Sequence, residues 1–415
     1  MNSEQVLFTP LNLPNGVTLK NRLCKAAMEE NLATIGQLPD GRLERLYARW
    51  AEGGAGLVLT GNVMISPSAL TGPGAVVLEQ GTDLEPFRRW AKAGTTNDTQ
   101  LWMQINHPGR QMYAAMGEEA VAPSAVPVSI GKYSNLIAPP RALSESEILE
   151  VIDRFSKAAR LAEQAGFTGV QIHAAHGYLT SQFLSPLTNQ RSDRWGGSPE
   201  NRARFLLEIV SAVREVVSPD FCVSVKLNSS DFQKGGFELD DAMNVAKKLN
   251  NLGVDLLELS GGSYESPAMY GRRADSTTSL REAFFVDFAR QIAQVANMPI
   301  MVTGGIFRRK TAIDALQMDK AGFGVSVLGI AKAFTRVPDL PNEWRAGRST
   351  NIKLPSVSWK NKTLAGVATS AIARRRLVQL ANGKQTKRSL SPLVSLIWDR
   401  MRIKKLTKRY RLWRR

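Results

Sequence analysis

The chain has 415 residues, enough for one large domain or two, and its 43% hydrophobic content and 33 glycines are ordinary for a soluble α/β protein. The net charge of +17 belongs to one end: residues 351–415 hold 18 Lys and Arg and one acid, Asp399, whereas the first 350 residues hold 36 of each sign. A nucleic-acid or membrane partner is therefore not indicated for the first 350 residues, and the lack of a Cys-x-x-Cys pair argues against an iron–sulfur cluster.

The cysteines and the N-terminus point to a reducing compartment. Cys24 and Cys222 each lie in an apolar, strand-like run, and we expect them to be buried thiols and not a disulfide. The first ten residues lack a charged region followed by an apolar core, and no apolar stretch is long enough to span a bilayer. We therefore expect a cytoplasmic location, peripheral to the membrane if the basic tail binds a bilayer.

In chain order, a short hairpin over residues 5–20 comes first, because Pro14-Asn15-Gly16 is a turn signal. Eight strand-like runs follow, at 22–28, 56–60, 100–105, 169–172, 221–227, 255–259, 299–303 and 324–328. Helical patterns lie between them at 41–52, 144–165, 201–217, 240–252 and 281–296, and Ser144-x-x-Glu147 forms a capping box before the second.

This alternation predicts an α/β fold, a (β/α)8 TIM barrel over residues 1–350 with the N-terminal hairpin as a cap and residues 351–415 as a basic helical extension. An open, doubly wound sheet is the alternative. That fold would carry Gly-x-Gly-x-x-Gly after its first strand, and the chain does not.

The fourth run changes character at its end, where His173, His176 and Tyr178 follow the apolar residues 169–172. Catalytic side chains of a parallel barrel lie where strands meet their following loops. Two imidazoles offer hydrogen bonds to a carbonyl or anionic oxygen, and a phenol can give up a proton. A metal site is the competing interpretation, but the motif offers no third ligand, so we predict catalytic residues and no metal.

Residues 173–205, which read HAAHGYLTSQFLSPLTNQRSDRWGGSPENRARF, resemble the signature segment of the old yellow enzyme family without a gap. Members of this family are FMN-dependent ene-reductases built on the eight-stranded α/β barrel. The resemblance extends over roughly residues 5–350. It implies an NAD(P)H-dependent flavin oxidoreductase with non-covalent FMN as cofactor and NADH or NADPH as reductant.

The ends of the first three strands are implied to contact the flavin ring. In the family the first strand ends in Pro-Met followed by Thr or Cys, which places Ala27 and Met28 against the ring and makes Ala27 and Glu29 departures from the pattern. A carboxylate at Glu29 would lower the flavin potential unless it points to solvent. The resemblance also assigns Asn62 and Gln104 to the pyrimidine side of the ring, and a plain turn residue is the alternative for Asn62.

The later strands are implied to hold the charged parts of the cofactor. Lys226 ends an alternating strand where relatives place a cation against flavin N1 and O2. Gly304 and Gly305 after the seventh strand, with Gly329 and Lys332 at the eighth, lie where barrels of this kind bind phosphate. Because the family usually has Arg at the last position, Lys332 would bind phosphate as a point charge.

The implied reaction takes hydride from a reduced nicotinamide to FMN and then to the β-carbon of an α,β-unsaturated carbonyl compound. His173 and His176 would hold the carbonyl oxygen, and Tyr178 would protonate the α-carbon from the opposite face. The alternative is a flavin oxidoreductase whose acceptor is oxygen, a quinone or a nitro compound. The substrate is a small electrophile, and we expect loops 114–140 and 263–279 to form the walls of its pocket.

The tail predicts a basic helix with an apolar edge. Within residues 391–415, apolar side chains fall near helical spacing among Lys and Arg, at Leu396, Ile403, Leu406, Tyr410 and Trp413. Such a helix is typical of proteins that bind an anionic membrane surface, so we expect its removal to abolish vesicle binding and leave turnover intact. Nucleic acid is the competing partner, and a solvated tail without a partner is the third possibility.

Overall fold

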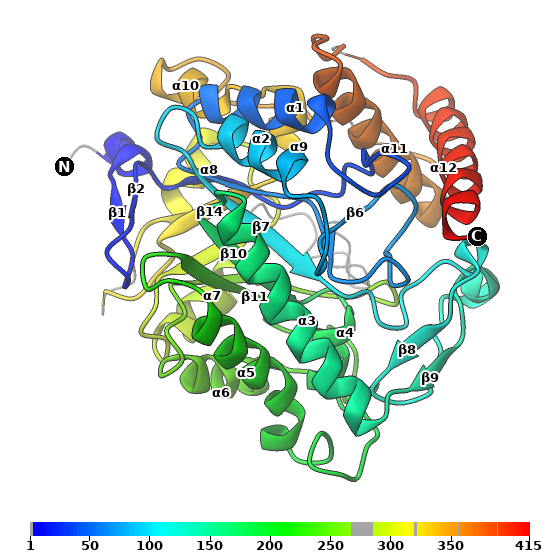
Figure 1. The fold of residues 1–415 in the computed structure, drawn as a ribbon. Helices are drawn as coiled ribbons and strands as arrows, with labels where there is room; N and C mark the ends of the chain where they lie inside the picture. The colour runs from blue at the N-terminus through cyan, green and yellow to red at the C-terminus, as the bar shows by residue number, and fades with distance from the viewer. Residues whose placement is uncertain (1–2, 267–284, 319–321, 355–356, 388) are drawn as a thin grey trace.

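The chain forms a closed barrel of eight parallel strands in the computed structural model, which describes residues 3–266, 285–318, 322–354, 357–387 and 389–415. Neighbouring strands follow each other in chain order, and the pairing of the fourth strand with the third completes the ring. The predicted (β/α)8 barrel is confirmed (Figure 1). Its strands are β3 (Leu23–Lys25), β4 (Leu57–Leu59), β7 (Gln100–Asn106), β10 (Gly169–Ala174), β11 (Cys222–Asn228), β12 (Leu256–Ser260), β13 (Ile300–Thr303) and β14 (Val327–Ile330).

Helices surround the barrel and bury apolar faces against it. Those between the strands are α1 (Gly41–Glu52), α2 (Glu85–Gly94), α3 (Glu145–Gln164), α4 (Leu179–Leu184), α5 (Pro199–Val216), α6 (Leu239–Leu249), α7 (Val286–Ala293) and α8 (Arg309–Ala315), followed by α9 (Lys332–Arg336) and α10 (Leu340–Arg345). The capping box of Ser144 and Glu147 is confirmed at the start of α3. The helix predicted over 281–296 is shorter in its described part, and residues 281–284 lie outside the described residues.

The N-terminal hairpin is also confirmed, as β1 (Leu11–Asn12) paired antiparallel with β2 (Thr18–Leu19). Leu13 and Leu19 are buried in a cluster with side chains from inside the barrel, among them Trp102. Cys24 and Cys222 belong to the same cluster as buried free thiols, as expected. The hairpin therefore closes the end of the barrel where the strands begin, and leaves the opposite end for a site.

Short strands and turns extend the loops around the barrel. They are β5 (Val63–Met64), β6 (Val76–Val77), β8 (Ala120–Ala122) and β9 (Pro140–Ala142), with 3-10 turns η1 (Ser3–Phe8), η2 (Ala114–Met116) and η3 (Gly131–Leu136). β5 pairs with the last residues of β7, so it carries the loop after β4 past the end of the barrel.

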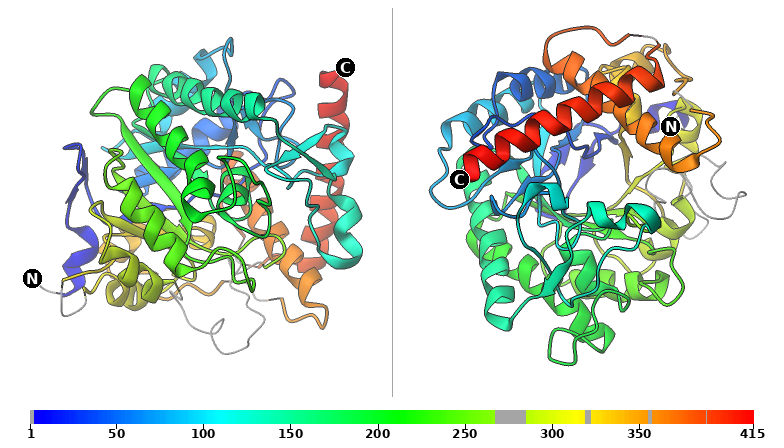
Figure 2. Two further views of the ribbon diagram at one scale, coloured as in Figure 1. Left: turned by 90° about the horizontal axis from the view of Figure 1, so that it is seen from below. Right: turned by 90° about the vertical axis from the view of Figure 1, so that its right-hand side faces the viewer.

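The basic extension folds back on the barrel as two helices, α11 (Lys362–Ala381) and α12 (Pro392–Arg414). α12 confirms the helix predicted over 391–415, and α11 lies within the helical extension predicted over 351–415, for which no separate helix bounds were given there. Figure 2 shows the two helices side by side across one end of the molecule, and α11 also packs on α1 and α9. The division proposed between residues 350 and 351 stays a prediction. Within the described part of the chain, no helix combines the length and apolarity needed to cross a membrane.

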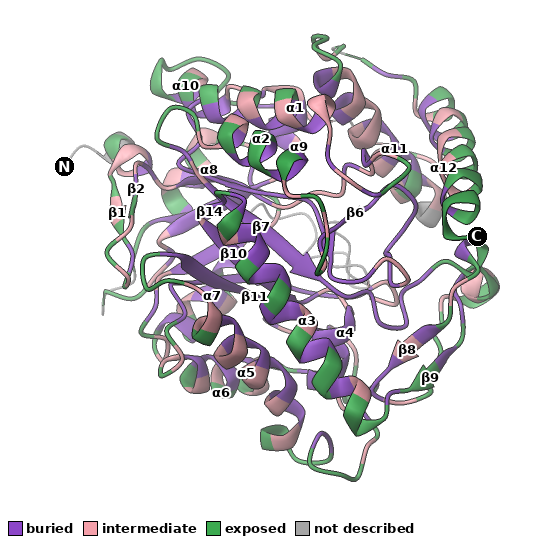
Figure 3. Ribbon diagram, viewed as in Figure 1, coloured by how far each residue is buried: buried purple, intermediate pink, exposed green. Residues whose placement is uncertain are grey.

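Burial divides α12 into two sides (Figure 3). Leu396 and Tyr410, which were expected to face a bilayer, are 7% and 1% exposed and pack against the rest of the chain. The opposite side exposes Leu393, Ile397 and Met401 instead. Binding of an anionic membrane by residues 391–415 stays a prediction, but Leu396 and Tyr410 are not available for it.

Candidate active site

A cavity of about 470 Å³ lies at the ends of the barrel strands where the loops begin. All of the residues that the sequence analysis assigned to catalysis or cofactor binding line it: Ala27, Met28, Asn62, Gln104, His173, His176, Tyr178, Lys226, Gly304, Gly305, Gly329 and Lys332. They come from seven different strands or strand ends, so the barrel topology is what brings them together. Their individual roles stay predictions.

His173, His176 and Tyr178 form one aromatic group at the end of β10. The ring centroids of the two histidines lie 5.1 Å apart, and the Tyr178 ring lies 4.8 Å from that of His173. His176 has a left-handed backbone, with φ at 61°. Its amide donates to Asn228 Oδ1 at 3.1 Å and its carbonyl accepts from Gln111 Nε2 at 2.9 Å. These two hydrogen bonds stabilise a backbone conformation that residues other than glycine rarely adopt.

Both histidines are neutral. Burial lowers the pKa of His173 and of His176 well below 6.5, and the positive charge of Lys226 lowers both further. His173 Nδ1 accepts from the amide of Ala175 at 3.2 Å, so the neutral ring carries its proton on Nε2. His176 Nε2 lies 2.8 Å from Ser260 Oγ at the end of β12. Both rings that line the cavity are therefore uncharged, and that of His173 carries an N–H at Nε2.

A chain of four buried polar side chains, which we call the floor, includes two that line the cavity, Gln104 and Lys226. Lys226 Nζ lies 2.7 Å from Glu258 Oε1, and the two residues face each other in the register of β11 and β12. Gln171 Nε2 donates to Glu258 Oε2 at 2.8 Å, and Gln104 Nε2 donates to Gln171 Oε1 at 2.7 Å. The charge of Lys226 is thus balanced within the barrel, and the side-chain orientation of Gln104 is fixed.

Glu29 lines the cavity and is half-buried. Its Oε1 accepts from Asn62 Nδ2 at 2.8 Å and from the Tyr178 hydroxyl at 3.4 Å. The Tyr178 hydroxyl also lies 3.4 Å from that of Tyr264. The departure at Glu29 therefore adds a carboxylate beside the phenol that was predicted to be the proton donor, and Tyr264 adds a second phenol.

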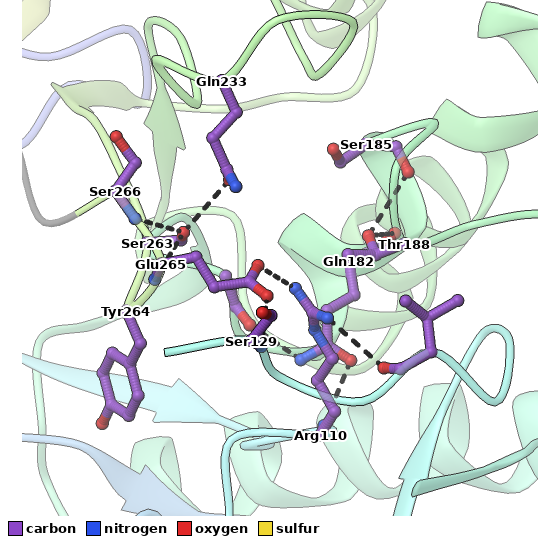
Figure 4. Close-up of polar contacts among 12 residues, drawn as sticks. Arg110, Ser129, Gln182, Ser185, Thr188, Gln233, Ser263, Tyr264, Glu265 and Ser266 are labelled. Atoms are coloured by element: carbon purple, nitrogen blue, oxygen red, sulfur yellow. Dashed lines mark hydrogen bonds and ion pairs between the residues drawn. The ribbon is translucent and has the colours of Figure 1, made fainter. Parts of the chain in front are cut away.

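Tyr264 is positioned by the ion pair of its neighbour Glu265 (Figure 4). Glu265 Oε2 lies 2.5 Å from Arg110 Nη2, and Glu265 Oε1 accepts from the amide of Ser129 at 2.7 Å. The close-up shows the Tyr264 ring projecting away from this polar cluster. The ion pair therefore joins the loop after β12 to the loop after β7.

The expectation for the pocket walls is partly wrong. Among the described residues that line the cavity, none comes from loop 114–140, which reaches the site only through contacts such as Ser129 with Glu265. Of loop 263–279, Tyr264 lines the cavity and residues 267–279 lie outside the described residues. A wall that the sequence analysis missed comes from α11, through Ser370, Arg374 and Leu377.

The residues around the cavity fit a flavin nucleotide. Asn62 Oδ1 and Thr303 Oγ1 are buried and have no hydrogen-bond partner within the described residues, so they are free to meet polar atoms of a bound molecule. Gly304 and Gly305 follow Thr303 with φ of 149° and 68°, a backbone that exposes successive N–H groups. Gly329 is needed for packing as well, because a Cβ there would come 1.8 Å from Thr303 Oγ1.

Three of the missed residues had signals in the sequence. Glu258 lies in an apolar strand-like run, and the buried Lys226 required a partner of this kind. Ser260 ends the sixth strand and Tyr264 follows it, at the same end of the barrel as His173. Arg374 had no comparable signal, because it is one of many cations in the basic extension. Within the described residues, no three His, Cys, Asp or Glu side chains gather as metal ligands would.

Residues 6–351 match the NADH:flavin oxidoreductase / NADH oxidase family. An NADH-dependent flavin oxidoreductase of Hypocrea jecorina is 39% identical over 353 residues, which cover 80% of this chain and 87% of the relative. One of Neonectria sp. is 37% identical over 388 residues, 87% of this chain, but the chain spans only 50% of that relative's length.

Solved structures agree with this assignment. An old yellow enzyme homologue from Zymomonas mobilis superposes with a TM-score of 0.69 at 26% identity, covering 84% of this chain and 97% of that one. Morphinone reductase gives a TM-score of 0.69 at 27% identity, covering 83% and 91%. The chain therefore belongs to the NADH:flavin oxidoreductase / NADH oxidase family, the old yellow enzymes, whose members use FMN as cofactor and NADH or NADPH as reductant.

Proposed function

We propose that this flavin oxidoreductase reduces the activated C=C bond of an α,β-unsaturated carbonyl compound. The observation that carries the proposal is the grouping of two neutral histidines and a phenol on one side of the cavity, with ring centroids 5.1 and 4.8 Å apart. This arrangement offers hydrogen bonds to a carbonyl oxygen and a proton to carbon within one site.

We assign the floor and the glycine loops to FMN. Ala27, Met28, Asn62, Gln104 and Lys226 would hold its ring system, and Gly304, Gly305, Gly329 and Lys332 would hold its phosphate. Bound there, FMN supplies hydride chemistry, with NADH or NADPH as the source. Lys226 would stabilise negative charge on the reduced ring. Because Lys226 is paired with Glu258, this stabilisation would be weaker than that from an unpaired cation.

His173 and His176 would bind the carbonyl oxygen of the substrate. As the hydride reaches the β-carbon, negative charge moves onto that oxygen, and the donors at the two imidazoles stabilise it. A charged imidazolium is not needed, because the low pKa of both histidines keeps them neutral over the physiological range. The left-handed His176 keeps its ring beside that of His173.

Tyr178 would protonate the α-carbon from the face opposite the hydride. The O–H bond of the phenol breaks, its proton forms the new C–H bond, and the phenolate then takes a proton from solvent. Hydride and proton together saturate the C=C bond without another reactant. Glu29 and Tyr264, both 3.4 Å from the Tyr178 hydroxyl, would hold the phenol in position between turnovers.

An anaerobic absorbance titration tests the proposal. We expect NADH or NADPH to bleach the flavin band of the purified protein and 2-cyclohexenone to restore it. A band that bleaches with the nicotinamide but does not return with the enone would contradict ene-reduction. Oxygen, a quinone and a nitro compound, supplied at equal concentration, would then identify the alternative acceptor.

A further inference from the structure

We propose that the C-terminal helix pair is a working part of the active site. In this proposal α11 provides a wall of the cavity that includes Arg374, and α12 positions both Arg374 and the loop that carries Glu29. The proposal rests on the placement of the flavin reaction in this cavity. It replaces the expectation that residues 391–415 can be removed without an effect on turnover.

Arg374 links the cavity to α12. Its side chain lines the cavity, and its guanidinium binds Asp399 with two contacts, from Nε at 2.8 Å and from Nη2 at 2.5 Å. The Asp399 side chain is 2% exposed, and Asp399 is the one acid after residue 350. A buried carboxylate with a bidentate Arg partner is a specific contact, unlike a solvated charge on a basic tail.

Arg402 links α12 to the loop after β3. Its Nη2 donates to the carbonyl oxygen of Glu30 at 3.2 Å and also to that of Asn31. Asn31 has a left-handed backbone with φ at 54°, and such a conformation needs support from its surroundings. Arg402 is half-buried, and burial lowers its pKa to about 10.

The same loop is held from the barrel side by Glu30. Its carboxylate lies 2.5 Å from the Tyr47 hydroxyl, which in turn accepts from the amide of Gly61 at 3.0 Å. Glu29 therefore directly precedes a residue, Glu30, that is held through its carboxylate by Tyr47 and through its carbonyl oxygen by Arg402 of α12. Because Glu29 contacts both Asn62 and Tyr178, a shift of this loop would reach the predicted proton donor.

The far end of α12 is anchored independently. Tyr410 is buried, and its hydroxyl oxygen lies 2.8 Å from the carbonyl oxygen of Pro67 and 2.9 Å from Glu118 Oε1. Leu406 approaches Gly74 so closely that a Cβ there would come 3.2 Å from its Cδ1. The middle and the C-terminal end of the helix contact the barrel domain, and its N-terminal half contacts α11, so α12 is docked along its length.

The test compares single substitutions in the full-length protein. Asp399→Asn and Arg402→Gln break the two links, and Lys405→Gln is the matched control, because it removes one charge from the exposed side of the same helix. For each variant we would measure FMN content, the melting temperature and the concentration dependence of flavin bleaching by NADH under anaerobic conditions. We expect the half-saturating NADH concentration to rise about tenfold in Asp399→Asn and Arg402→Gln, as for loss of a charged hydrogen bond, and to stay unchanged in the control.

A double variant separates a role in the site from a role in stability alone. Asp399→Asn/Arg374→Met removes both charges of the pair, so the melting temperature should recover while the half-saturating concentration stays raised. Variants that lose melting temperature but keep the wild-type NADH dependence would overturn the inference. A wild-type protein whose flavin bleaches with NADH but is not restored by enone would contradict only the proposed ene-reduction.

Discussion

The floor and the rim of the cavity are held in different ways. The floor consists of Gln104, Gln171, Glu258 and Lys226. Strand register pairs Gln104 with Gln171 and Lys226 with Glu258, and a hydrogen bond from Gln171 to Glu258 joins the two pairs. The rim, which we define as Glu29, Tyr264 and Arg374, comes from two loops and a helix far apart in the sequence. Arg374 is held by its own ion pair with Asp399. Tyr264 and Glu29 are held through contacts of the residues that follow them, Glu265 with Arg110 and Glu30 with Arg402.

The floor and the rim are therefore suited to different roles, cofactor binding and control of access. The floor side chains stand on barrel strands and cannot move without breaking buried polar contacts, as a cofactor site requires. The rim depends on contacts such as Arg374–Asp399 and Arg110–Glu265, which can change while the barrel stays intact. We therefore expect substitutions in the floor to reduce stability and FMN binding, and substitutions in the rim to change access and substrate preference.

The largest effect is expected from breaking the ion pair in the floor. Glu258→Gln leaves Lys226 buried with no counter-charge, which should lower the free energy of unfolding by about 3–5 kcal/mol and reduce FMN content. Urea unfolding and the ratio of flavin to protein absorbance would measure this. Glu258→Gln/Lys226→Met, which removes both charges, should recover most of the stability. Equal stability of the wild type and Glu258→Gln would show that the floor is not held by this pair.

The buried histidines predict a loss of stability in acid. The native pKa of His107 is about 3, and those of His173 and His176 also lie well below 6.5, so below pH 6.5 the unfolded chain binds protons that the native protein excludes. Each histidine should cost about 1.4 kcal/mol of unfolding free energy at pH 5.5 relative to neutral pH. Urea unfolding at both pH values checks this. Stability that does not change between pH 7 and 5.5 would contradict the neutral, buried histidines.

A smaller effect is expected at the rim from Glu29→Gln, which keeps a hydrogen-bond partner for Asn62 and removes the negative charge. Without that charge the reduced flavin is easier to form, so the midpoint potential should rise by on the order of 30 mV, which corresponds to about 1.4 kcal/mol for two electrons. Spectroelectrochemical titration measures this shift. An unchanged potential, with FMN content at the wild-type level, would place the Glu29 charge out of reach of the flavin.

The smallest effect on the site is expected from the outward side of α12. If this side binds an anionic bilayer, Ile397→Asp should reduce sedimentation with phosphatidylserine vesicles and leave the NADH dependence of flavin bleaching unchanged, because Ile397 is 52% exposed. The exposed Lys405→Gln variant should weaken sedimentation less. Sedimentation of the wild type that is no greater with anionic than with neutral vesicles would end the membrane proposal.

The sequence predicted the barrel and the residues at its strand ends because both depend on local periodicity and on a long signature segment. Gln104, His173 and Lys226 stand at fixed places on strands, so their meeting follows from the topology alone. Arg374 and Tyr264 were missed because their positions depend on how α11 and the loop after β12 dock. That docking depends on single contacts such as Asp399 with Arg374, which composition does not reveal. The docking of α12 on the rest of the chain is likewise not visible in the composition, and its apolar edge was therefore assigned to a bilayer.

Rapid mixing of Tyr178→Phe tests the central claim most directly, because it separates the two halves of the reaction. We expect bleaching of the flavin by NADH to proceed within about threefold of the wild-type rate, since this step needs no proton from the phenol. Reoxidation by 2-cyclohexenone should slow by roughly 100-fold or more, the usual contribution of a general acid. Reoxidation of the variant at the wild-type rate would contradict the role of Tyr178 as the proton donor at this site.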